Sequence, residues 1–75
     1  MDAPKFELGQ RVYNRANPYH GKVVQIFTVL GVHGWCYLIE LDRPNIANES
    51  HHYYGEGGLR ATLEESLEWQ KGNRL

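Results

Sequence analysis

Cysteine is nearly absent from this chain, in which Cys36 stands alone among 75 residues. A single cysteine cannot close a disulfide within the chain, so the cross-links that hold many small secreted domains together are excluded. The residues after Met1 include Asp2 and Lys5 and form no apolar run typical of a signal peptide. Both features predict a protein of the reducing cytoplasm.

Long hydrophobic runs are missing as well. The longest apolar stretch, Val23 to Leu30, contains Gln25 and Thr28 and is far shorter than the roughly 20 residues that cross a bilayer. We therefore expect no membrane contact. A chain of this length has room for one hydrophobic core, and we expect its stability to be modest.

Neither sign of charge is in excess, since eight Lys and Arg oppose nine Asp and Glu for a net charge of −1. This balance lacks the strong positive charge typical of proteins that bind phosphate backbones. Basic residues gather in the first part of the chain and glutamates in the later part, at Lys5, Arg11, Arg15 and Lys22 and at Glu56, Glu64, Glu65 and Glu68. The pattern predicts a surface with two sides of opposite charge.

Segments rich in β-branched and aromatic residues alternate with segments rich in glycine, proline and asparagine, which predicts short strands joined by turns. We expect extended segments at Phe6 to Tyr13, Lys22 to Leu30, Trp35 to Leu41, His51 to Tyr54 and Leu59 to Ala61. We expect connections at Leu8-Gly9, Asn14 to Gly21, Gly31 to Gly34 and Asp42 to Ser50, and an irregular turn at Gly55 to Gly58. The fold class is therefore predicted as mainly β, a small barrel of about five strands.

Strict alternation assigns each strand residue to a face. One face of the second strand would carry Val24, Ile26, Thr28 and Leu30, and the other Val23, Gln25, Phe27 and Val29. Both faces are largely apolar, so we expect one to meet the barrel core and the other to meet the helix or a second subunit. One face of the third strand would carry Trp35, Tyr37, Ile39 and Leu41, opposite Cys36, Leu38 and Glu40.

A helix is predicted at the C-terminal end. Thr62 and Glu65 match the capping box that satisfies free backbone donors at a helix start. The helix is expected from Leu63 to Lys71, with Gly72 as a left-handed stop. The face expected to dock consists of Leu63 and Leu67, with Trp69 at its flank. The chain thus divides into a loose N-terminus (1–5), a barrel (6–61), a helix packed on the barrel (62–72) and a tail (73–75).

Four different short motifs lie along the barrel region, at Leu8-Gly9-Gln10-Arg11-Val12, Gly21-Lys22-Val23-Val24, Tyr37-Leu38-Ile39-Glu40-Leu41-Asp42 and Tyr53-Tyr54-Gly55-Glu56-Gly57-Gly58-Leu59. They resemble the motifs of small SH3-like barrels of bacterial and phage origin. The resemblance spans most of residues 6–59 and implies an SH3-like barrel from a bacterium, a phage or a mobile element. It implies little about function, because this fold carries many unrelated activities.

In length and strand order the chain is also similar to the plasmid-borne trimethoprim-resistant dihydrofolate reductases. That family places a Val-Gln-Ile-Tyr strand in a pore formed by four subunits, with a lysine from an early loop drawing in anionic ligands. Here the corresponding stretch is His51 to Tyr54, so Tyr54 matches the tyrosine, while His52 and Tyr53 replace glutamine and isoleucine. The resemblance implies that Arg15 stands near the position of that lysine. The resemblance implies a reductase as a third hypothesis.

Metal and nucleophile sites are not supported by the residue pattern. His51 and His52 are adjacent in an expected strand, so they point to opposite faces and cannot bind one ion together. His20 and His33 lie in separate loops and are interpreted as solvated histidines. Cys36 lies in an apolar strand without an activating neighbour and is interpreted as a buried small hydrophobe. We predict no metal, no cofactor and no catalytic residue.

Aromatic residues are the best candidates for a binding site. SH3-like barrels display aromatics in a groove between two loops, which implies a groove of Tyr13, Arg15, Tyr19, Trp35, Tyr53 and Tyr54. The alternative interpretation is that half of these aromatics are wall residues of the barrel. Exposed aromatics bind proline-rich peptides, stack on bases or form subunit interfaces.

The leading hypothesis is a non-catalytic interaction module. It would bind a protein partner, or associate with itself as a homodimer or higher homo-oligomer, through the aromatic groove or the second apolar face of Val23 to Leu30. The alternative is a weak nucleic-acid-binding domain that uses four basic residues, Lys5, Arg11, Arg15 and Lys22.

Overall fold

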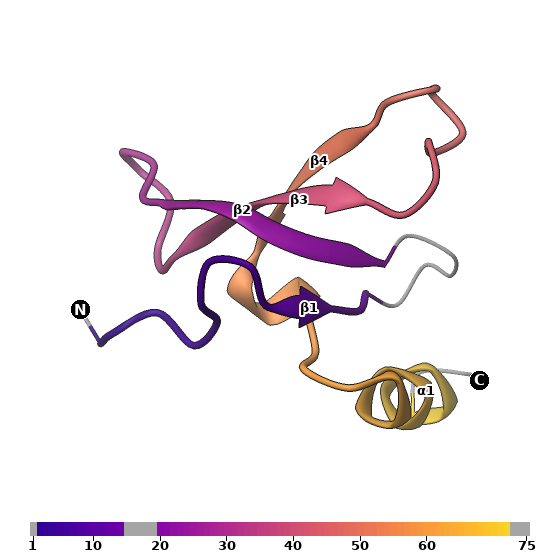
Figure 1. The fold of residues 1–75 in the computed structure, drawn as a ribbon. Coiled ribbons are helices and arrows are strands. Elements are labelled where there is room, and N and C mark those ends of the chain that lie inside the picture. The colour runs from indigo at the N-terminus through magenta and orange to yellow at the C-terminus, as the bar shows by residue number, and fades with distance from the viewer. Residues whose placement is uncertain (1, 15–19, 73–75) are drawn as a thin grey trace.

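The computed structural model describes residues 2–14 and 20–72. Four antiparallel strands form one sheet in the order β1-β2-β3-β4. The strands are β1 (Arg11–Val12), β2 (Gly21–Phe27), β3 (Cys36–Leu41) and β4 (His51–Gly55). A 3₁₀ turn, η1 (Glu56–Gly58), and a helix, α1 (Leu63–Gly72), follow. Figure 1 shows the sheet curling into a half-barrel, with α1 lying beyond β1. The prediction of a mainly β fold with a C-terminal helix is confirmed.

The inner face of the curled sheet holds the core. Its buried side chains are Phe6, Val12, Val23, Tyr37, Ile39, Leu41 and Leu59. The three from β3, Tyr37, Ile39 and Leu41, alternate along the strand as predicted, and Trp35 packs against the same cluster from just before it. Residues from both ends of the barrel region, Phe6 and Leu59, therefore cover the sheet from the open side.

The predicted division of β2 into two faces is wrong. Val23 pairs with Ile39 while Gln25 pairs with Leu38, so Val24 is an extra residue that has no partner on β3. Such a bulge reverses the alternation beyond it. Val23 is buried and Ile26 packs against the core, although strict alternation placed them on opposite faces. The strand also ends at Phe27 rather than Leu30.

The segment that closes the half-barrel is shorter than the predicted fifth strand. The residues predicted as a fifth strand, Leu59 to Ala61, make an isolated bridge between Arg60 and Tyr13. Its two backbone hydrogen bonds run from Tyr13 N to Arg60 O at 2.9 Å and from Arg60 N to Tyr13 O at 2.8 Å. The chain that follows β4 thus returns to the opposite edge of the sheet, next to β1.

The glycine-rich segment after β4 is regular, which corrects the prediction of an irregular turn. Gly55 ends β4, and residues 56–58 form η1. Tertiary contacts to Glu56 fix this turn. Its carboxylate accepts hydrogen bonds from the Tyr37 hydroxyl at 2.5 Å and from the Lys5 N–H at 3.0 Å. Those contacts also hold the N-terminal residues against the sheet.

The helix α1 starts as predicted but docks differently. The Thr62 hydroxyl accepts a hydrogen bond from the Glu65 N–H at 3.1 Å, as a capping residue does. The expected docking face is wrong, because Leu63 and Leu67 are 46% and 47% exposed. Ser66 is buried instead, and its hydroxyl donates to the carbonyl oxygen of Asn14 at 2.9 Å.

The end of α1 also departs from expectation. Gly72 is the last helical residue rather than a stop beyond the helix, and its φ is not positive. The flank of the helix is held by Arg60, whose guanidinium lies 3.8 Å from the centroid of the Trp69 ring. No helix in the described part of the chain is long and apolar enough to cross a membrane.

Candidate binding surface

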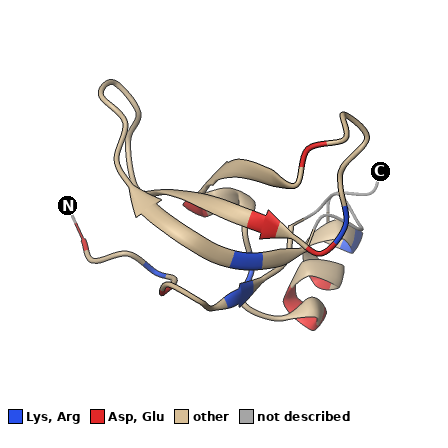
Figure 2. Ribbon diagram, turned by 45° about the horizontal axis from the view of Figure 1, so that its top comes forward, with Lys and Arg blue, Asp and Glu red and all other residues tan. Residues whose placement is uncertain are grey.

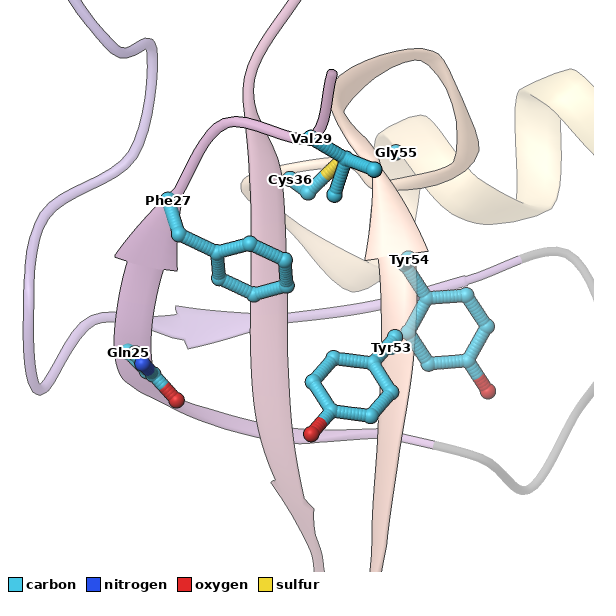
Figure 3. A pocket seen from close by; sticks show the side chains of 7 residues that line it. All are labelled: Gln25, Phe27, Val29, Cys36, Tyr53, Tyr54 and Gly55. Atoms are coloured by element: carbon cyan, nitrogen blue, oxygen red, sulfur yellow. The ribbon is translucent and has the colours of Figure 1, made fainter. Parts of the chain in front are cut away.

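An apolar hollow of about 390 Å³ lies on the outer side of the sheet, at the end of β2, β3 and β4 nearest the β2–β3 hairpin. Seven residues line it: Gln25, Phe27, Val29, Cys36, Tyr53, Tyr54 and Gly55. Figure 3 shows their side chains around the opening. We call this feature the outer hollow.

Strand register creates the outer hollow. Phe27 pairs with Cys36 on β3, and Cys36 pairs with Gly55 on β4. These residues share a face, so a large ring, a small thiol and a glycine without a side chain stand side by side across three strands. Because side-chain size decreases from Phe27 to Gly55, space is left above Cys36 and Gly55. A Cβ added at Gly55 would meet no atom within 4 Å.

Aromatic rings form the rim of the outer hollow. The Phe27 and Tyr53 rings lie edge to face, with centroids 5.4 Å apart and planes at 88°. Tyr53 keeps 62% of its surface exposed and Val29 keeps 42%. Exposed apolar side chains that gather around a concavity suit the binding of another apolar group. Gln25 adds an amide and Tyr53 a phenol that can orient what binds.

The two neighbouring tyrosines of β4 lie on different faces. Tyr53 stands on the outer face, whereas Tyr54 packs against the core cluster and reaches the hollow from its side. The ring of Tyr54 also contacts His52, with centroids 5.0 Å apart. Tyr54 therefore acts mainly as a wall residue, and Tyr53 is the exposed anchor.

Charges occupy the other end of the same outer face. Glu40 lies 3.6 Å from the Lys22 ammonium and 3.7 Å from the His51 imidazole. Figure 2 shows acidic and basic residues at this end of the sheet and none of either on the hairpin between β2 and β3. The outer face is thus divided into a polar end and an apolar end.

The residues of the predicted groove do not all line the outer hollow. Tyr53 and Tyr54 do. Trp35 lines a second hollow with Asp2 and Glu56, and its indole N–H donates to the Asp2 carbonyl oxygen at 2.6 Å. Arg15 and Tyr19 lie outside the described residues.

Tyr13, the remaining member of the predicted groove, lies in a cluster of polar residues beside β1. Its ring centroid lies 4.9 Å from that of His20, and the Arg11 guanidinium lies 5.4 Å from it. Arg11 forms a bidentate ion pair with Asp42. Hydrogen bonds from Arg11 lower the pKa of the Asp42 carboxyl, and burial lowers the pKa of His20 with help from the nearby Arg11 charge.

The histidines of β4 are separated as predicted. The His51 imidazole faces Glu40, and that of His52 lies 3.5 Å from Glu49. Among residues 2–14 and 20–72, no three His, Cys, Asp or Glu side chains are placed to hold a metal ion.

Cys36 corrects one sequence interpretation. Predicted as a buried small hydrophobe, it is half-buried and forms part of the floor of the outer hollow. Sequence reasoning included Phe27 and Val29 in a second apolar face but missed Cys36 and Gly55. Their place in the site depends on cross-strand register, which alternation within one strand does not reveal.

Comparison of the chain with protein-family models, curated proteins and solved structures finds no match.

Proposed function

We propose that this chain is a non-catalytic SH3-like interaction module that binds a protein through the outer hollow. One observation carries the proposal: Val29 and Tyr53, both exposed to solvent, and the half-buried Phe27 line a concavity on a sheet face. Leaving apolar surface exposed costs about 25 cal/mol per Å², so a partner that covers it gains binding energy. An aromatic or aliphatic side chain is the group best suited to the space.

The charge distribution supports a protein partner over a nucleic acid. Two of the four basic residues considered for phosphate binding are paired with acids, Arg11 with Asp42 and Lys22 with Glu40. Each pair offsets the positive charge that a phosphate would need. The residues that line the outer hollow carry no cation. Nucleic-acid binding is thus the second candidate.

The SH3-like assignment is part of the proposal. Its support is the strand order together with the bridge from Arg60 to Tyr13, which brings the chain after β4 back to the β1 edge. The reductase hypothesis gains less support. Tyr53, which stands where the reductase motif has isoleucine, contributes a large exposed ring to the outer face. A standard NADPH-dependent dihydrofolate assay tests that hypothesis directly.

Selection of a phage-displayed peptide library against the full chain tests the proposed function. We expect selected peptides to share an aromatic or aliphatic anchor and to bind equally well at low and physiological salt. Tyr53→Ser and Phe27→Ser should each weaken binding about tenfold or more, the effect of losing a buried aromatic contact. Leu30→Ser is the matched control, because Leu30 is fully exposed and does not line the hollow.

Two results would overturn this function. One is binding by Tyr53→Ser and Phe27→Ser that equals wild type. The other is failure of all peptides together with retention of DNA or RNA that weakens steeply with salt, which would favour the nucleic-acid alternative.

A further inference from the structure

The outer edge of β4 presents a row of outward-facing backbone groups. Leu41 N donates to Ser50 O at 2.9 Å, and Glu56 N donates to Trp35 O at 3.1 Å. These two bonds set the alternation of the β3–β4 ladder, so the backbone groups of His52 and Tyr54 point toward β3. The N–H and C=O groups of the intervening residues, His51, Tyr53 and Gly55, therefore point away from the sheet. Among the described residues no strand pairs with this edge.

This edge lacks the features that keep edge strands apart. Natural sheets protect their edges with charged side chains, prolines or bulges. The sequence of β4, HHYYG, contains no lysine, arginine, acid or proline, and its pairing with β3 is regular. At the other end of the sheet, β1 is followed by the bridge to Arg60. β4 is thus an edge strand along all five of its residues, with no strand paired on its outer side among the described residues.

We propose that β4 pairs with the β4 strand of a second copy of this chain, antiparallel and centred on Tyr53. The inference rests on the proposed role as a protein-binding module and names the partner as a second copy. In this register Tyr53 stands opposite the partner's Tyr53, and Gly55 stands opposite the partner's His51. The two sheets join into one continuous sheet of eight strands.

Hydrogen-bond geometry selects this register. Outward-facing groups occur at every second residue, so a residue of one strand must meet an outward-facing residue of the other. Centring the strand pairing on Tyr53 uses all three outward-facing residues of each copy. About four to six hydrogen bonds form, because each such pair exchanges two and the Gly55 C=O, at the N-cap of η1, already accepts the first hydrogen bond of that turn. A shift by two residues leaves one of the three pairs unmade. A second copy fits because an antiparallel strand is complementary to itself around a two-fold axis.

The pairing of the two β4 strands also completes the outer hollow. Opposite residues of paired strands project to the same face, so the partner's Tyr53 lies beside Tyr53 on the rim. The partner's His51 comes next to Gly55, where the hollow has no side chain and the Cβ position is empty. Each copy therefore contributes two residues to the other's hollow.

Gly55→Pro is the decisive variant. Gly55 has a φ of −73°, which proline adopts, and no atom lies within 4 Å of an added Cβ. The Gly55 N–H points outward. Proline therefore removes one hydrogen-bond donor from the β4–β4 pairing and leaves the β3–β4 ladder intact. Gly55→Ala is the matched control, since it adds a side chain and keeps the N–H.

The experiment measures the mass of wild type, Gly55→Ala and Gly55→Pro by sedimentation over a roughly hundredfold concentration series. We expect wild type and Gly55→Ala to pass from monomer to dimer with rising concentration. Gly55→Pro should dissociate about tenfold or more readily, from the loss of two hydrogen bonds per dimer. Amide exchange adds a residue-specific measurement: the His51, Tyr53 and Gly55 amides of wild type should be protected only where the dimer forms.

Three results would overturn the pairing. They are a wild-type monomer at every concentration, equal dimerisation by Gly55→Pro and Gly55→Ala, and a dimer in which the three amides exchange as fast as in the monomer. Peptide binding that depends on Tyr53 in a purely monomeric protein would reject the pairing alone and keep the proposed function. A dimer sensitive to Gly55→Pro without any peptide binding would instead reject the hollow as a peptide site.

Discussion

The two faces of one sheet differ in what they contact, although both are rich in apolar side chains. On the inner face Val23, Tyr37 and Ile39 are exposed by 1% or less. On the outer face Tyr53 keeps 62% of its surface open. The difference comes from chain segments distant in sequence, because Phe6 and Leu59 cover one face and no described segment fills the hollow on the other. Hydrophobicity alone therefore does not decide which face becomes core.

The two faces should differ most in how much stability is lost when a side chain is truncated to alanine. Ile39→Ala removes a fully buried side chain from the inner face and should lower the free energy of unfolding by about 2–5 kcal/mol. Leu38→Ala, its neighbour on the outer face, should cost about 1 kcal/mol or less, because the site is half-buried and can fill with water. Urea unfolding at low protein concentration measures both. Equal losses would show that the outer face is as closely packed as the inner one.

Local sequence patterns predicted the elements of the fold well. The positions of β2, β3 and β4 follow from β-branched and aromatic runs between turn residues, and the start of α1 follows from Thr62 and Glu65. These signals lie within a few residues of each other. They need no knowledge of the rest of the fold.

Predictions that depended on distant partners were less accurate. The bulge at Val24 changed which residues of β2 face the core, and the buried carbonyl of Asn14 made Ser66 the docking residue of α1. The site shows the same limit. Tyr53 was predicted as a candidate from its residue type, whereas Gly55 entered the hollow through its register with Cys36.

A smaller contrast is expected from removing one hydroxyl on each face. The Tyr37 hydroxyl accepts from the Lys5 and Phe6 N–H groups at 3.1 and 3.4 Å and donates to Glu56. Tyr37→Phe should cost about 1–3 kcal/mol, because the buried Phe6 N–H loses its partner. Tyr53→Phe on the outer face should change stability by about 0.5 kcal/mol or less. Equal effects of the two substitutions in urea unfolding would contradict this contrast.

The cost of Tyr37→Phe should also depend on pH. The hydrogen bond from Tyr37 lowers the pKa of Glu56 below its ordinary value of 4.5, with help from the Lys5 N–H. A depressed carboxyl pKa stabilises the fold above the ordinary value, and this contribution is lost as pH falls through the folded-state pKa. The difference in unfolding free energy between wild type and Tyr37→Phe should therefore be largest above pH 4.5 and narrow below it. A difference that is constant from pH 7 to about pH 3 would contradict the link to Glu56.

The smallest contrast compares two faces of α1. Ser66 is buried and donates to Asn14, so Ser66→Ala removes a hydrogen bond worth about 1 kcal/mol. Alanine has the higher helix propensity by about 0.5 kcal/mol, which leaves a net loss of roughly 0.5 kcal/mol. Leu67→Ala removes a side chain that is about half exposed, and alanine is a slightly better helix former than leucine, so the effect should stay within about 0.5 kcal/mol. Urea midpoints of the two variants decide between the docking faces, and a larger loss for Leu67→Ala would restore the leucine face that the sequence predicted.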